Sequence, residues 1–132
     1  MIKTIKVNTN SRTEMVDITS HVKKIVDESG TKSGLCIIYV PHTTAAVTIN
    51  EGADPAVVRD MVMTLNEHYP QRADYKHMEG NSDAHIKTSL VGSSETVIIE
   101  NGKLQLGTWQ SIYFCEFDGA RSRTVYIKIV EG

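Results

Sequence analysis

An uninterrupted apolar run at residues 35–40 is the feature that most constrains how this chain can fold. Strands covered on both faces carry apolar side chains without alternation, so this run predicts a central strand of a sheet. Pro41 ends the strand, because proline has no N–H to donate to a neighbouring strand. A second, largely apolar run spans residues 111–117. We therefore expect two doubly covered strands in the core.

Three segments carry the start and stop signals of helices. The first spans residues 19–30 and ends at a glycine, and the second opens with Asp54 as N-cap and Pro55 as first helical residue. The third begins after Gly80 and ends at Gly92. Apolar residues recur at helical spacing in the second segment, which predicts that one of its sides packs on the sheet.

Strand patterns occupy both ends of the chain, at residues 2–8 and 121–130. Asn101-Gly102 separates two further strand-like segments and predicts a hairpin with a type I′ turn. About seven strands and three helices, with an antiparallel C-terminal part, indicate an α+β fold. A length of 132 residues suits one domain, residues 1–132, with its own core.

Charge and hydropathy exclude two classes of partner. A net charge of −2 gives no general attraction to nucleic acid or to an anionic membrane surface. No apolar run approaches the roughly 18 residues that cross a bilayer, and the N-terminus lacks the apolar stretch of a signal peptide. We therefore expect a cytoplasmic protein without nucleic-acid or membrane partners. Cys36 and Cys115 lie in the two apolar runs and are predicted to be buried free thiols.

Polar side chains that can take part in catalysis or ligand binding gather in two clusters. Residues 77–85 hold two histidines, two carboxylates and an asparagine around a single glycine. The second cluster is Pro41-His42-Thr43-Thr44, which follows the apolar run at 35–40, together with Asn50-Glu51-Gly52 at the other end of the next apolar run. A polar connection at the end of a buried strand is a common place for a functional site. We predict that the two clusters meet and form one site for a small molecule.

The histidines of these clusters are the candidate metal ligands. His42, His77 and His85 all lie in polar connections, and three imidazoles with an open fourth position are typical of catalytic zinc. Their spacing matches no standard zinc motif. The alternative is that they are polar loop residues without a metal.

Two glutamates and the helix start at Asn81 extend the candidate site. Glu51 and Glu79 can act as a general base or orient an imidazole, or they serve only as capping and surface carboxylates. The helix that opens at Asn81 presents free N–H groups to a phosphate, and Arg121 adds positive charge.

Four more residues are candidate ligand contacts. Thr43 and Thr44 can donate hydrogen bonds to a ligand or satisfy a turn. Trp109, the only tryptophan, can stack on a planar ring while Gln110 bonds to its edge. The alternative for Trp109 is a core aromatic residue at the entry to a strand.

Several motifs follow one another over nearly the whole chain in an order known from one family. These are His42-Thr43-Thr44-Ala45, Asn50-Glu51, Asp54-Pro55, His77-x-Glu79-Gly80-Asn81-x-x-Ala84-His85, Gly107-x-Trp109-Gln110 and Gly119-x-Arg121. On these motifs the chain resembles the YjbQ-like proteins (UPF0047), also called the secondary thiamine-phosphate synthase family.

The resemblance implies a fold, an assembly and an activity. The fold is a mixed β-sandwich with packed helices, assembled as a homotrimer. The activity is a transfer that joins hydroxymethylpyrimidine pyrophosphate to thiazole phosphate, with Glu51, His77 and His85 as catalytic residues. The implied pocket, which neighbouring subunits can share, contains His42, Glu51, His77, Asn81, His85 and Trp109, with a divalent metal, zinc, on the histidines.

The choice of metal separates three candidate functions. Displacing pyrophosphate suits Mg²⁺, which prefers carboxylate and phosphate oxygens, whereas imidazoles suit zinc. A zinc-bound water favours hydrolysis of a small phosphorylated or anionic substrate instead. The third candidate is a non-catalytic protein that binds such a ligand.

Overall fold

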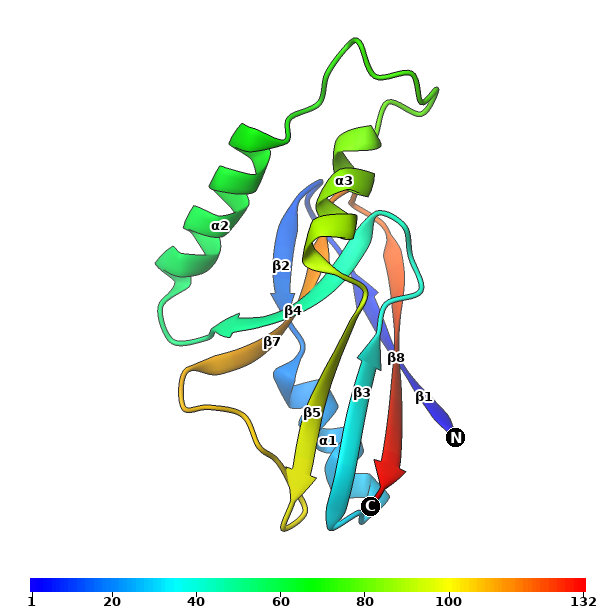
Figure 1. Ribbon diagram of the computed structural model, residues 1–132, viewed down its shortest axis with the longest axis vertical. Coiled ribbons are helices and arrows are strands. Elements are labelled where there is room, and N and C mark those ends of the chain that lie inside the picture. The colour runs from blue at the N-terminus through cyan, green and yellow to red at the C-terminus, as the bar shows by residue number, and fades with distance from the viewer.

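Two antiparallel sheets form the framework of the computed structural model, which describes residues 1–132 (Figure 1). One sheet has five strands in the order β1-β8-β3-β5-β6, and the other has three in the order β2-β7-β4. The strands are β1 (Ile2–Asn8), β2 (Glu14–Asp17), β3 (Ser33–Tyr39), β4 (Ala45–Glu51), β5 (Ser94–Glu100), β6 (Lys103–Leu104), β7 (Gln110–Glu116) and β8 (Ser122–Glu131). The helices are α1 (Thr19–Ser29), α2 (Pro55–His68) and α3 (Ser82–Val91). The predicted α+β class is confirmed, with eight strands rather than about seven.

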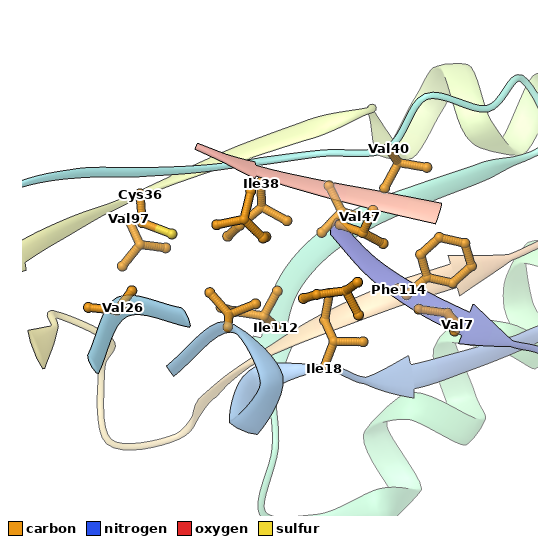
Figure 2. Close-up of a cluster of buried hydrophobic side chains, with 14 of the residues drawn as sticks. Val7, Ile18, Val26, Cys36, Ile38, Val40, Val47, Val97, Ile112 and Phe114 are labelled. Atoms are coloured by element: carbon orange, nitrogen blue, oxygen red, sulfur yellow. The ribbon is translucent and has the colours of Figure 1, made fainter. Parts of the chain in front are cut away.

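The main core lies between the two sheets and is completed by α1. Ile38 of β3 and Phe114 of β7 are fully buried there, together with Val22 of α1 (Figure 2 shows part of this cluster). Burying each such side chain contributes about 1.5–3 kcal/mol to folding. This apolar contact holds the two sheets together and fixes where their ends meet.

A second apolar cluster covers the other face of the three-stranded sheet. Tyr113, Cys115 and Phe117 pack there with Ala84 of α3, and half-buried Val58 and Leu65 of α2 complete the layer. Helices α2 and α3 therefore cover this sheet from outside, which Figure 1 shows. The run at 111–117 is confirmed as a doubly covered strand.

The run at residues 35–40 was predicted to be covered on both faces, and within one chain that prediction is wrong. β3 is central in its sheet, and Cys36 and Ile38 point into the core. On the opposite face Leu35 is 41% exposed and Tyr39 is 45% exposed. The reason is that both outer helices lie on the three-stranded sheet.

The helix and turn signals are confirmed. Gly30 takes a left-handed φ of 68° at the end of α1, and the Asp54 side chain accepts a hydrogen bond from the N–H of Ala56 at the start of α2. Asn101 and Gly102 have φ values of 53° and 75°, as a type I′ turn requires. None of the helices has the length and apolar character of a membrane span.

Both cysteines are free and buried, as predicted. Burial raises the pKa of the Cys36 thiol to about 11 and that of Cys115 to about 12. Neither thiol is activated as a nucleophile, because thiolates form at low pKa.

Candidate functional site

Three segments converge on a polar cleft of about 650 Å³. They are the connection from β3 to β4, the stretch that leads into α3, and the start of β8, all at one end of the molecule (Figure 1). Only one of the eleven lining residues is hydrophobic. The lining residues are Tyr39, Pro41, His42, Thr43, Thr44, His77, Glu79, Asn81, His85, Arg121 and Arg123.

The β3–β4 connection enters the cleft because its two strands belong to different sheets. Pro41 follows β3, and the chain must cross from one sheet to the other before β4 begins at Ala45. Thr44 is buried, and its Oγ1 accepts a hydrogen bond of 2.9 Å from Nη2 of Arg123. The crossing is therefore held from beneath, and it presents His42 and Thr43 to the cleft.

His42 has one nitrogen already engaged by the backbone. Its Nε2 accepts a hydrogen bond of 3.0 Å from the N–H of Thr124 in β8. A neutral imidazole has one acceptor nitrogen and one N–H, so the proton resides on Nδ1. Burial and the nearby charge of Arg123 lower the pKa of His42, which favours this neutral form. His42 therefore offers a hydrogen-bond donor.

His77 and His85 lie next to each other, on either side of a turn at Gly80. Gly80 has a φ of 71°, and its N–H bonds to the carbonyl of His77. The two rings meet edge to face, with 5.4 Å between their centroids. Both line the cleft, as His42 does.

The predicted three-histidine metal site does not fit this geometry. Metal ligation uses the imidazole lone pair, and the lone pair of His42 Nε2 is taken by Thr124. No group of three histidine, cysteine, aspartate or glutamate side chains is arranged to hold an ion. The structure brings the three histidines to one cleft without making them a common ligand set.

A buried ion pair under the cleft holds β7 to β8. Glu116 and Arg123 are nearly inaccessible, and Arg123 Nε donates to Glu116 Oε1 at 2.8 Å. Burial raises the pKa of Glu116, but hydrogen bonds from Arg123, Thr9 and the N–H of Asp118 outweigh it, so the net pKa is lowered. Arg123 lines the cleft, but its charge is neutralised by Glu116.

Asn81 and Arg121 share a carboxylate that sequence reasoning missed. Asp118 Oδ2 accepts hydrogen bonds from Asn81 Nδ2 at 2.7 Å and from Arg121 Nη2 at 2.9 Å. Asp118 looked like an ordinary turn residue before Gly119, so only its position after a buried strand hinted at this role. The Arg121 side chain stays half exposed at the cleft.

A second buried pair supports α3. Asp83 accepts two hydrogen bonds from the guanidinium of Arg12, and its carboxylate is 3.5 Å from Nζ of Lys87. Burial raises the pKa of Asp83, but these two cations outweigh it and the net pKa is lowered. The Asp83 carboxylate is thereby engaged by two cations and does not face a ligand alone.

Glu51, Trp109 and Gln110 do not line the cleft, so within one chain they lie apart from the histidines with which the resemblance groups them. They line a separate hollow of about 250 Å³ with Ile49 and Asn50. Glu51 pairs with Gln110 at the far end of β4, and the seven residues of β4 span about 20 Å (Figure 1). Trp109 is 64% exposed rather than a core aromatic.

Comparison with known proteins identifies the family. A profile of the UPF0047 protein YjbQ-like family matches residues 3–132. The chain belongs to the YjbQ-like family. YjbQ-like relatives include the UPF0047 protein YugU of Bacillus subtilis, 55% identical over 98% of this chain and 99% of its own. The UPF0047 protein MJ1081 of Methanocaldococcus jannaschii is 52% identical over 98% of this chain and 94% of its own.

Solved YjbQ-like structures share the fold. A family member from Clostridium acetobutylicum superimposes with a TM-score of 0.95 at 55% identity, covering 97% of this chain and 99% of its own. A protein of unknown function from Sulfolobus solfataricus gives the same TM-score at 34% identity, covering 100% and 97%. The fold is therefore that of the family, while the names of these relatives assign no activity.

Proposed function

We propose that the cleft binds a small phosphorylated substrate and that the protein is a transferase of the thiamine-phosphate synthase type. The single observation that carries the proposal is the gathering of hydrogen-bond donors in one polar cleft. His42 supplies an Nδ1–H, Thr43 a hydroxyl and Arg121 a half-exposed guanidinium. Such groups bind the oxygens of phosphate and pyrophosphate.

The proposed reaction needs anion stabilisation more than a base. The C–O bond to pyrophosphate breaks and a C–N bond to the thiazole nitrogen forms, and that nitrogen attacks with its own lone pair. The charge that develops is on the departing pyrophosphate, which donors in the cleft stabilise. His77 or His85 can give a proton to that leaving group as general acid. Glu79 is the carboxylate available in the cleft, in place of the predicted Glu51.

An assay of thiamine phosphate formation tests the proposal. Purified protein receives the pyrimidine pyrophosphate and the thiazole phosphate with Mg²⁺, which binds pyrophosphate oxygens. We expect product with wild type and a loss of about 100-fold or more in His85→Ala. His21→Ala is the matched control, because His21 is exposed on α1, outside the cleft.

Two results would contradict the proposal. Equal rates in wild type and His85→Ala would remove the histidine pair from the chemistry. No product from wild type, with pyrophosphate still bound in the cleft, would leave a non-catalytic binding protein.

A further inference from the structure

One residue that lines the cleft carries a buried polar atom without a partner. Asn81 is only 5% exposed, and its Oδ1 is buried without any hydrogen bond. An unpaired buried acceptor costs about 1–3 kcal/mol, so proteins rarely keep one without a use. Asn81 lines the cleft beside Glu79 and His85, where a ligand can supply the missing donor.

The orientation of the Asn81 amide is fixed by two carboxylates. Its Nδ2 donates to Asp118 Oδ2 at 2.7 Å and lies 3.5 Å from Glu79 Oε2. Turning the amide over would place its oxygen against both carboxylates and would remove both hydrogen bonds. The amide nitrogen of Asn81 is therefore directed at carboxylates, and only its Oδ1 acceptor remains for a ligand.

The helix does not use that acceptor either. Asn81 occupies the N-cap position of α3, where the side chain usually accepts a hydrogen bond from the first turn. Here no such side-chain bond forms. A deprotonated phosphate oxygen is itself an acceptor, so the partner of Asn81 Oδ1 is a different group of the ligand.

We infer that Asn81 Oδ1 recognises an N–H or O–H group of the substrate and thereby determines its specificity. The cleft then has two chemically different sides, with donors at His42, Thr43 and Arg121 and an acceptor at Asn81. A ligand that matches both sides carries an amino or hydroxyl group in addition to its phosphate. This inference rests on the proposed function, and there the amino group of the aminopyrimidine is the matching donor.

Calorimetric titration with three probes tests the inference. The probes are inorganic pyrophosphate, the aminopyrimidine pyrophosphate, and the same compound with hydrogen in place of the amino group. We expect wild type to bind the amino form at least about 10-fold more tightly than the form without it, because a site built for a hydrogen bond rejects the analogue that lacks it. Asn81→Ala should lose this preference and bind the two pyrimidine compounds equally.

The controls separate failure of this inference from failure of the proposed function. Asn50→Ala removes an asparagine outside the cleft and should keep the full preference. If wild type binds inorganic pyrophosphate but binds both pyrimidines equally, Asn81 is not a specificity determinant and the proposed function survives. If wild type binds none of the three probes, the proposed function fails and this inference fails with it. The wild-type comparison decides even where Asn81→Ala does not fold.

Discussion

The chemistry of His42 is set by a single backbone contact. Thr124 N–H points at Nε2, so the proton of the neutral ring is on Nδ1. Sequence reasoning placed His42 in a site because it follows a buried strand and a proline. It could not assign the nitrogen, because Thr124 is 82 residues away and reaches His42 only when β8 pairs with β3.

Nitrogen NMR of the histidine rings tests this tautomer. We expect His42 to carry its proton on Nδ1 at pH 7. Burial and the nearby charge of Arg123 disfavour the charged ring, so the midpoint should lie below the ordinary value of about 6.5. A ring protonated at Nε2 at pH 7 would contradict this tautomer and leave the Nδ1 lone pair free for a metal, and a midpoint above about 6.5 would contradict the neutral form.

Strand β4 holds apart two polar groups, at Thr44 and at Glu51, that the sequence suggested belong to one site. Thr44 precedes β4 and Glu51 ends it, so an apolar run with polar residues at both ends looked like one site. An extended strand puts its ends about 20 Å apart, and only the pairing of β4 with β7 shows that Glu51 faces Gln110 and Trp109. Local patterns predicted the elements well, whereas the distances between their ends depend on strand pairing.

The Glu116–Arg123 pair predicts a large loss of stability when one partner is removed. Arg123→Met leaves the buried Glu116 carboxylate without its cation, which typically costs about 3–5 kcal/mol. Urea denaturation measures this change in the free energy of unfolding. Adding Glu116→Leu should recover part of the loss, since it removes the unpaired charge.

An exposed ion pair serves as the control for this prediction. Arg72 and Asp74 are joined at the surface, so Arg72→Met should change stability little. A loss in Arg123→Met no larger than that in Arg72→Met would show that the buried pair does not hold β7 to β8.

At the scale of the molecule, the five-stranded sheet has an uncovered apolar face. Leu35 lies in register between Ile98 and Val130, and Tyr39 lies beside Tyr126. All five side chains are substantially exposed. The sequence predicted Leu35 and Tyr39 to be buried, but a single chain leaves them exposed. We therefore expect a second chain to cover them.

The family resemblance implies a homotrimer, and an assembly that covers this face can be detected by its mass. Light scattering should report three times the 14.6 kDa mass of the chain. Ile98→Lys places a charge on the exposed face and should reduce that mass, whereas Lys24→Glu, exposed on α1 away from this face, should change it less. A wild-type mass of one chain at all concentrations would contradict the assembly.

Titration of ¹⁵N-labelled protein with inorganic pyrophosphate tests whether the polar cleft binds phosphorylated ligands, because backbone amide shifts report where the anion binds. We expect the largest shifts on residues 42–44 and on Arg121, at the donor side of the cleft. Shifts centred on Glu51 and Trp109, at the opposite end of β4, or no shifts at millimolar pyrophosphate, would contradict this expectation.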